Sequence, residues 1–590
     1  MSSKRPAHRP TRIYPEAERR LLRPDSEQCP HCGGRLLNSG TLYLHKYIQT
    51  LEGPVEVRAY GWRCAHPACP HPEARYYARA TALRLSLPFG TYGVDVLAWI
   101  GWQRDYEHRA LVEIHRQLNA RGIEISERHV GRLYRDYLAL VGGLTHEIQQ
   151  RLTATVQRDG GLIWAVDALQ PEAGAPLFYV LYEIRSQTAV AGIWLEQRDQ
   201  AHLAAWLARF AHAAWPVSAT LSDGEGALVG ALKQVWPEAP HQRCQMHALK
   251  AWAAPLAEAD RELRRRLRAA VMTSLPPLAA AADQLPGART PDLAPPGPLA
   301  PEVAAPLPLG ATERGVAVDA SPRQQVLLRQ LHQAFLDGLT RPGRSPLLLG
   351  GLRGYEHLEQ IVTTLARRLP PYRDTPLHPY LRAGQQALAQ TQALAATLRT
   401  NQQRLQQVAH RLAEPFACLP ADTPPDQIGP RLRAHLQGVV LDWSATAQTP
   451  LDRAFALKGL DLLTEWGPDL FHCYRIPDLP PSNTALEALF GQLRRHQRRL
   501  SGHKQTAPLQ RQAHLLIWRL ATSFEHLCQL LRSVSDQARR TARHFVAAAE
   551  ARSRWLLSVR RRPATATAAL VAEYLDLLAL PTEVSLPLAA

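Results

Sequence analysis

Two aspartates stand within or directly after stretches of the chain that are otherwise apolar. Asp167 interrupts the run GLIWAVDAL (161–169), and Asp223 closes the run PVSATLSDG (216–224). Burying a carboxylate in such a strand costs several kcal/mol unless it is paired or bound to a metal. Two adjacent carboxylates repel each other unless a divalent cation lies between them, and their hard oxygen atoms favour Mg²⁺ or Mn²⁺. We therefore expect a catalytic Mg²⁺ or Mn²⁺ site.

The strands around these aspartates decide whether the two side chains can meet. Apolar runs and helical periodicity predict strands at 161–169, 175–186, 188–198, 216–224 and 241–244, with helices at 200–213 and 225–235. The resulting order, βββαβαβ, is that of an RNase H-like sheet, in which the first and fourth strands lie side by side. Asp167 and Asp223 would then sit together.

The segments around these acids resemble those of a known family. Val-Asp167-Ala and Ser-Asp223-Gly-Glu look like the first two acids of bacterial insertion-sequence DDE transposases. Arg-Cys244-Gln-Met-His247 is similar to the Cys-x-x-His signature of the Mutator-like group of these enzymes. That group continues with an α-helical insertion, so the resemblance implies one here.

The third acid of that group lies in an Asn-x-x-x-Glu helix. The segment Asn483-Thr-Ala-Leu-Glu487 matches this pattern, and the resemblance covers roughly residues 160 to 510. It implies that Glu487 completes a catalytic set with Asp167 and Asp223.

The helix around Glu487 supports this assignment independently of the resemblance. Arg494 and Arg498 follow at helical spacing and point within a narrow angle of Glu487. One helix would thus offer a metal ligand and two phosphate-binding guanidinium groups, as DNA cleavage requires. A solvated acid on an amphipathic helix is the alternative for Glu487, and Glu465 in LLTEWGPDL is the rival third acid.

Cys244 and His247 leave more than one role open. Two ligands do not make a zinc site, and no second pair lies nearby in the sequence. The resemblance implies that they support the active site, as Asn483 would, or that they contact DNA. Core packing is the alternative. A Cys–His nucleophile is disfavoured, because a three-residue spacing across a strand-to-helix junction controls the geometry poorly.

Four of the eight cysteines lie in two pairs near the N-terminus. They are Cys29, Cys32, Cys64 and Cys69. The segment between the pairs alternates apolar and polar residues around Glu52-Gly53-Pro54, which predicts a β-hairpin. Two cysteine pairs at opposite ends of a hairpin suit tetrahedral ligation of a structural Zn²⁺. Free, partly buried cysteines are the alternative.

A helix-turn-helix is predicted after this zinc ribbon. A helix at 108–120 leads through a turn with Gly122 to Ser126, a good N-cap for a second helix. The second helix carries an apolar stripe of Val130, Leu133, Tyr134, Tyr137, Leu138 and Val141. The residues expected to face outward and bind DNA are Arg128, His129, Arg132 and Arg135. An ordinary helical pair with a solvated basic face is the alternative.

The composition favours a nucleic-acid partner. Lysine and arginine number 69 against 52 aspartates and glutamates, which gives a formal charge of +17 over 590 residues. The sequence has neither an apolar run of membrane-spanning length nor the apolar middle of a signal peptide, so we expect no membrane partner. Eight cysteines in so long a chain fit a reducing cytoplasm, and DNA binding would associate the protein with the nucleoid.

The predicted fold class is an α/β RNase H-like catalytic core with a large α-helical insertion, preceded by a zinc ribbon and a helix-turn-helix domain. The predicted order is a basic flexible arm (1–23), the zinc ribbon (24–80), the helix-turn-helix domain (81–150), the first part of the core (155–250), the α-helical insertion (251–475) with a Pro/Ala-rich linker (273–310), the third-acid helix of the core (476–530) and basic C-terminal helices (531–590).

The implied function is that of a DDE-type DNA transposase. The enzyme would bind double-stranded DNA at the terminal inverted repeats of its element and at a target. It would then perform divalent-metal-dependent phosphodiester hydrolysis and strand transfer. Acting on two ends implies a homodimer or higher oligomer. The alternatives are a non-catalytic DNA-binding regulator or domesticated transposase remnant, and an RNase H-like nuclease without strand transfer.

Overall fold

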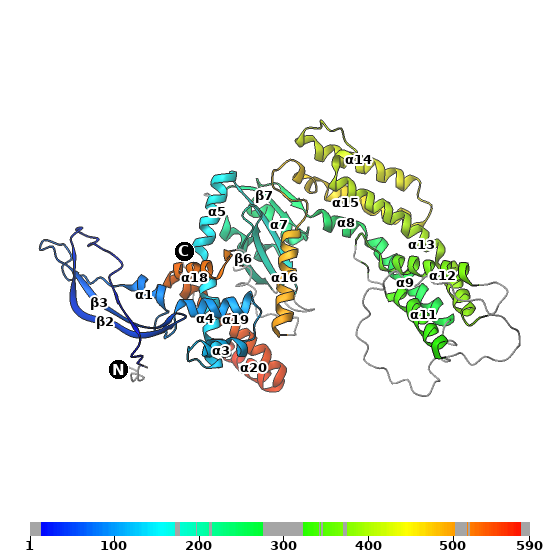
Figure 1. Ribbon diagram of the computed structural model, residues 1–590. Helices are drawn as coiled ribbons and strands as arrows, with labels where there is room; N and C mark the ends of the chain where they lie inside the picture. Colours follow the sequence, from blue (N-terminus) through cyan, green and yellow to red (C-terminus); the bar gives the residue numbers. More distant parts are fainter. Residues whose placement is uncertain are drawn as a thin grey trace. The chain divides into compact units, whose positions relative to one another are not determined.

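The computed structural model divides the chain into two compact units (Figure 1). Unit 1 comprises Met1–Gln242 and Asp478–Ala590, and unit 2 comprises Arg243–Pro477. The structure describes residues 13–170, 177–195, 198–211, 215–274, 322–340, 343, 346–369, 375–501, 516 and 520–579. Unit 1 is mixed α/β, whereas the regular elements described in unit 2 are helices. None of the described helices combines the length and the apolar character that a bilayer span requires.

The predicted hairpin is present at the start of unit 1. Strands β2 (Leu36–Thr50) and β3 (Gly53–Cys64) pair antiparallel around the predicted turn. A further strand, β1 (Glu18–Leu22), pairs parallel to β3. This strand falls within the segment that we expected to be a flexible arm, residues 1–23, of which residues 1–12 lie outside the described part. The expectation of a flexible arm is wrong for this strand, because its backbone pairs with β3 from Glu18 to Leu22 and Leu22 is buried in the hairpin core.

Helices follow the hairpin, and all but the first of them share one apolar core with the second sheet. They are α1 (Arg79–Leu85), α2 (Val94–Asp105), α3 (Leu111–Ala120), α4 (Glu127–Gly142) and α5 (Thr145–Asp159). The first helix of the predicted pair begins at Leu111 instead of His108. The backbone of His108 has a φ of +57°, which no α-helix can contain, and its Nδ1 lies 2.6 Å from Nδ1 of His496.

The central sheet of unit 1 has five strands in the order β6-β5-β4-β7-β8. The strands are β4 (Leu162–Leu169), β5 (Leu177–Glu183), β6 (Thr188–Leu195), β7 (Val217–Ser222) and β8 (His241–Arg243). β4 pairs antiparallel with β5 and parallel with β7, so the predicted adjacency of the first and fourth strands is confirmed. Helices α6 (Gln200–Leu207) and α7 (Gly226–Val235) connect the later strands and pack on each other.

The segment that follows unit 2 in the sequence, Asp478–Ala590, belongs to unit 1. It forms α16 (Thr484–Ser501), α18 (Phe524–Ser533), α19 (Asp536–Arg561) and α20 (Pro563–Ala579). α19 packs closely on α4: a Cβ added at Gly143 would lie 2.7 Å from a methyl carbon of Val534 and 3.3 Å from the backbone of Ala538. The prediction of basic C-terminal helices holds for α19 but is wrong for α20, whose sequence PATATAALVAEYLDLLA contains no basic residue.

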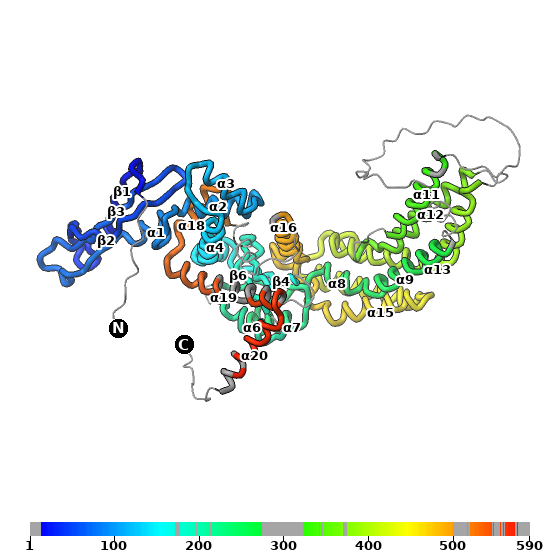
Figure 2. Tube along the Cα trace, turned by 90° about the horizontal axis from the view of Figure 1, so that it is seen from below, coloured from blue at the N-terminus to red at the C-terminus, as the bar shows by residue number. Residues whose placement is uncertain are grey.

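Unit 2 consists of long helices that pack around their own apolar core (Figure 2). They are α8 (Gln245–Trp252), α9 (Ala254–Ser274), α11 (Pro322–Thr340), α12 (Gly350–Arg368), α13 (His378–Ala413), α14 (Pro425–Ala445) and α15 (Pro450–Glu465). The buried carboxylate of Asp260 accepts the amides of Gly351 and Leu352 and thereby caps α12. The first two residues of the predicted Pro/Ala-rich linker (273–310) belong to α9, and the remainder lies outside the described residues.

Candidate active site and DNA-binding surfaces

Asp167 lies near the end of β4, in the middle of the sheet. The residue is only 7% exposed, and the amide of Ala168 donates to its Oδ1 at 2.7 Å. The pKa of Asp167 is raised from its ordinary value to about 7. Burial is the largest cause, and the negative charges of Asp223 and Glu487 act in the same direction. A guanidinium, that of Arg494, acts in the opposite direction. The other two predicted acids therefore lie within electrostatic reach of Asp167.

The register of β4 and β7 explains how Asp223 comes close to Asp167. The two strands run parallel, with Ala165 opposite Leu221. Asp167 and Asp223 each follow two residues after this pair, so both emerge at the same edge of the sheet. Asp223 is half-buried and begins a turn in which Gly224 has a φ of +95°. A residue with a Cβ rarely adopts this conformation, which accounts for the glycine.

Glu487 reaches the same region from α16. Asn483 directly precedes this helix, and its side-chain amide donates to the carbonyl of Val166 on β4 at 3.2 Å. The amide of Glu487 donates to the carbonyl of Asn483 at 3.1 Å, so the third acid lies one turn into the helix. The helix buries an apolar face made of Leu486, Leu489, Phe490 and Leu493. Glu487, Arg494 and Arg498 remain exposed.

The three acids form a donor set of hard oxygen ligands, which suits Mg²⁺ or Mn²⁺. Their carboxylates are not drawn together, however. Among the described residues, only the four N-terminal cysteines place three or more ligand atoms within 4.8 Å of one another. The side chain of Glu487 is exposed and has the freedom to close on a cation.

A fourth carboxylate, Glu225, belongs to this cluster, and sequence reasoning assigned it no role. Its Oε2 accepts the hydroxyl of Tyr179, from the neighbouring strand β5, at 3.1 Å. Its amide donates to Oδ1 of Asp223 at 3.1 Å. Burial raises the pKa of Glu225, and the charge of Asp223 adds to this effect. The signal was present in the motif Ser-Asp-Gly-Glu, but the contact with Tyr179 was not predictable.

Glu465 and the Cys-x-x-His pair lie in unit 2. Glu465 is the last residue of α15, is exposed, and accepts the indole N–H of Trp466 at 3.3 Å. Cys244 is buried at the N-cap position of α8, and its side chain does not cap the helix. His247, one turn later, is half-buried, with its Nδ1 shielded from solvent. A role of Cys244 and His247 in supporting the acids stays a prediction.

The four cysteines of the hairpin come together in unit 1. The sulfur of Cys29 lies 3.8 Å from that of Cys69, and the sulfurs of Cys32 and Cys64 are 3.4 Å apart. Thiolates around a tetrahedral zinc are expected at about 3.8 Å, given a Zn–S bond of about 2.3 Å. The cluster could therefore hold a structural metal such as zinc.

Local geometry supports this cluster. The amide of Gly33 donates to the carbonyl of Cys29, and Gly33 itself has a φ of +69°. A Cβ at Gly34 would lie 3.2 Å from the sulfur of Cys64. The two glycines therefore allow the chain to turn tightly behind the first cysteine pair.

The helical pair α3 and α4 matches the predicted helix-turn-helix in its packing. The hydroxyl oxygen of Ser126 accepts the amide of His129, as an N-cap does, and Gly122 forms the turn with a φ of +80°. All six residues of the predicted apolar stripe are buried. The three predicted DNA-contacting arginines, Arg128, Arg132 and Arg135, are exposed.

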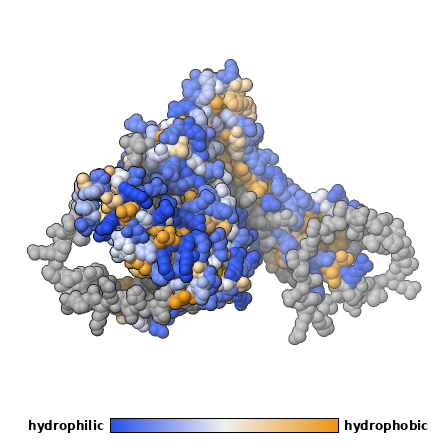
Figure 3. Space-filling view, turned by 60° about the vertical axis from the view of Figure 1, so that its left-hand side comes forward, coloured by the Kyte–Doolittle hydropathy of each residue, from blue (hydrophilic) through white to orange (hydrophobic). Residues whose placement is uncertain are grey.

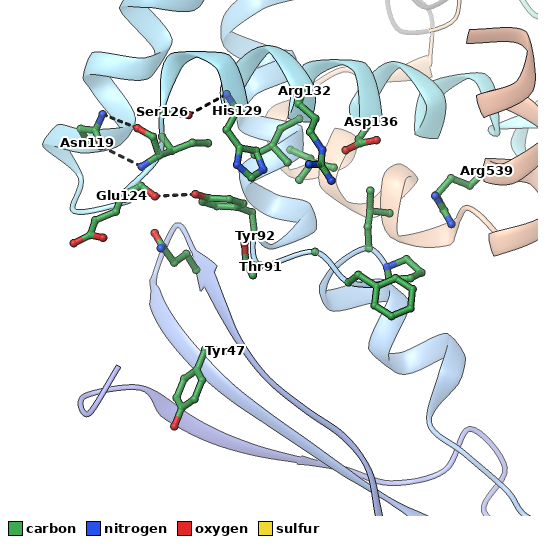
Figure 4. A pocket seen from close by; sticks show the side chains of 18 of the residues that line it. Tyr47, Thr91, Tyr92, Asn119, Glu124, Ser126, His129, Arg132, Asp136 and Arg539 are labelled. Carbon is green, nitrogen blue, oxygen red and sulfur yellow. Dashed lines mark hydrogen bonds between the residues drawn. The ribbon is translucent and has the colours of Figure 1, made fainter. Parts of the chain in front are cut away.

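His129 differs from those arginines, because it is half-buried. Its ring packs edge-on against Tyr92, with 5.0 Å between the ring centroids. Burial lowers the pKa of His129, and the neighbouring Arg132 lowers it further. The expectation that His129 points outward is therefore wrong in part: the imidazole faces the loop before α2 (Figure 4).

Comparison with known protein families and with curated proteins finds no match for this chain. The roles proposed for the site residues therefore rest on their positions and chemistry alone.

Proposed function

We propose that the protein is a DDE-type DNA transposase with an RNase H-like catalytic core. One observation carries the proposal: three acids from distant parts of the sequence lie in one electrostatic cluster, at the edge of a sheet where β4 and β7 run side by side. The strand order β6-β5-β4-β7-β8, with a single antiparallel meander and a parallel crossover, is the order expected of that core. The helical unit between Asp223 and Glu487 corresponds to the expected insertion.

The site residues would have different roles in the reaction. Asp167, Asp223 and Glu487 would supply the carboxylate ligands of the catalytic divalent cations. Such cations activate a water or a DNA 3′-hydroxyl and stabilise the leaving oxygen when they are bound. Arg494 and Arg498 lie on the exposed side of α16 and would hold the phosphates of the strand to be cut. Asn483 positions the helix that carries Glu487.

DNA recognition is assigned to the N-terminal part of unit 1. The exposed arginines of α4 would contact the terminal inverted repeats, and the zinc ribbon would extend the contact along the duplex. A reaction on two element ends requires two active sites, so we propose a homodimer or higher oligomer on DNA. Its DNA substrate would place the protein on the nucleoid, in the cytoplasm.

The proposal is tested by cleavage of DNA that carries the candidate ends, found as inverted repeats around the coding sequence. With Mg²⁺ or Mn²⁺ the wild type should nick these ends and join them to a target. Asp167→Asn, Asp223→Asn and Glu487→Gln should each abolish cleavage while DNA binding persists. Glu465→Gln is the matched control and should cleave normally. Full activity in any of the three acid variants would remove that residue from the site.

The alternatives predict other outcomes of the same experiment. A DNA-binding regulator or a domesticated remnant would bind the ends and cut nothing under any metal condition. A nuclease without strand transfer would cut but leave no joined product. The three acids are all present in one cluster, which favours a catalytic protein over a remnant.

A further inference from the structure

One phenylalanine stands fully exposed beside the helical pair α3 and α4. Phe89, in the loop between α1 and α2, is 103% exposed, the highest value among the large apolar side chains of the described residues. Hydrophilic side chains cover most of the face seen in Figure 3, and apolar side chains are interspersed among them. The backbone of Phe89 has a φ of +57°. Such a conformation is strained for a bulky residue, and strain of this kind gathers at functional sites.

A half-buried lysine holds this loop in shape. The ammonium of Lys46, on β2, donates to the carbonyl of Leu87 at 3.2 Å and to that of Gly90 at 3.4 Å, and also to the hydroxyl of Ser86. Burial lowers the pKa of Lys46 to about 8. The amide of Gly90 donates back to the carbonyl of Leu87 at 2.9 Å, which closes a tight turn. These hydrogen bonds fix the backbone of the loop on both sides of Phe89.

The far end of the loop is fixed as well. The hydroxyl of Tyr92 donates to the carbonyl of Glu124, in the turn between α3 and α4, at 2.7 Å (Figure 4). The amide of Gln49, on β2, donates to the carbonyl of Thr91 at 2.8 Å. These bonds tie the loop to both the hairpin and the helical pair.

The loop lines a groove of about 960 Å³ whose other walls come from α4 and α19. Arg132 projects into it from α4 and Arg539 from α19 (Figure 4). Arg543 also lines the groove and lies 3.9 Å from the carboxylate of Asp136. Three arginines and two acids, Glu124 and Asp136, line the groove, an excess of one positive charge. Arg539 is buried and donates to Asp536, so the exposed arginines of the lining are Arg132 and Arg543.

We propose that this groove receives a DNA strand, with Phe89 stacked against a base and with Arg132 and Arg543 against the flanking phosphates. A ring held clear of the surface can insert at a base step or stack on an unpaired base. Cationic walls on either side of it match the charge of the phosphate backbone. The inference rests on the proposed DNA binding but requires nothing of the three acids.

The test uses duplexes from the DNA that flanks the coding sequence, with 2-aminopurine placed at successive positions. Full-length wild type should raise the fluorescence at one step, because insertion unstacks the reporter base. Phe89→Ala should abolish this rise and weaken binding about five- to hundredfold, the loss expected for one base–aromatic stack. Phe89→Trp should retain both signals. Phe416→Ala, which removes a 49%-exposed phenylalanine in unit 2, is the matched control.

Two further measurements separate stacking from other effects. Thermal unfolding of Phe89→Ala should match the wild type, since the ring buries no surface. The slope of log affinity against log salt should stay unchanged in Phe89→Ala and should fall by about one in Arg543→Gln, which loses a phosphate contact.

The outcomes distinguish this inference from the proposed function. If the wild type binds none of the duplexes, the proposed DNA binding fails together with the groove. If the wild type binds and Phe89→Ala equals it in affinity and fluorescence, only the groove assignment is wrong. If Phe89→Ala alters self-association and leaves DNA binding intact, the ring serves a protein contact and the inference is overturned.

Discussion

The side-chain amide of Asn483 donates a hydrogen bond of 3.2 Å to the main-chain carbonyl of Val166, the residue before Asp167. This contact joins the strand of the first acid to the helix of the third. Asn483 is 1% exposed, so water cannot replace the lost partner after substitution.

Replacing Asn483 by alanine should therefore loosen α16 on β4. We expect a loss of about 1–3 kcal/mol of stability, as for other buried hydrogen bonds left unmade. Cleavage should fall more than stability, because Glu487 would no longer be held near Asp167. Asn483→Asp should be worse than alanine, since a carboxylate cannot donate and adds a negative charge to an acidic cluster. Thr484→Ala, one residue later and exposed, is the control for both denaturation and cleavage assays.

The raised pKa of Asp167 predicts how pH acts on the metal-free protein. Its pKa of about 7 in the fold lies above the ordinary 3.8, so the folded state keeps a proton that the unfolded chain releases between these values. Stability should fall as the pH rises through this window, by up to roughly 1.4 kcal/mol per pKa unit. Asp167→Asn should remove that part of the pH dependence, as measured by chemical denaturation at a series of pH values.

Divalent cations should reverse this trend, because a cation must displace the proton of Asp167. We expect the increase in Tm caused by Mn²⁺ to grow as the pH rises toward about 7 and to vanish in Asp167→Asn. Asp199→Asn, which changes a half-buried aspartate at the N-cap of α6, should show the same Mn²⁺ effect as the wild type. An equal Mn²⁺ effect at every pH would contradict the assignment of Asp167 as a metal ligand.

Glu225 is expected to assist Asp223. Glu225→Gln should reduce cleavage at least about tenfold, the lower end of the range for residues that support metal ligands. Tyr179→Phe should act differently, because the hydrogen bond from Tyr179 lowers the pKa of Glu225. Without that bond the pKa rises, and the acidic limb of the pH–rate profile should move to higher pH. A cleavage rate in Glu225→Gln equal to that of the wild type at all pH values would leave Glu225 outside the site.

The cysteine cluster can be tested by its metal content. Cys32→Ser should release one equivalent of zinc, measured by elemental analysis, and should make the hairpin sensitive to proteolysis. Treatment of the wild type with a strong chelator should have the same effect. Cys418→Ser alters a cysteine of unit 2, outside the cluster, so this variant should contain as much zinc as the wild type. Retained zinc in Cys32→Ser would show that the sulfurs are close for another reason.

Much of the fold was predictable where the signal is local. Ser126 could be identified as an N-cap from the apolar stripe that follows it. Asp167 could be placed by the apolar run that it interrupts, and Asp223 by the run that ends at it. The first four cysteines could be grouped because a hairpin joins their pairs. Each of these predictions needed only neighbouring residues and the strand or helix period.

The remainder depends on contacts between distant residues. No local pattern indicates that Glu18–Leu22 pairs with β3 and forms a strand in an apparently flexible arm. The meeting of His108 with His496, which accompanies the late start of α3, joins parts of the chain almost 400 residues apart. The bracing of the Phe89 loop by Lys46 is equally invisible in the sequence, because a lysine in a hairpin is normally solvated.

Unit 1 is assembled from two lengths of chain, and the helical unit is synthesised between them. A ribosome that has finished β7 and Asp223 must still translate the whole of unit 2 before Glu487 exists. A chain that ends within unit 2 therefore lacks Glu487, and it also lacks α18, which shares its apolar core with α4, and α19, which packs on α4. Under the proposed function, early termination would remove the third acid and the support of the proposed DNA-binding helix together, so a truncated product would be inactive.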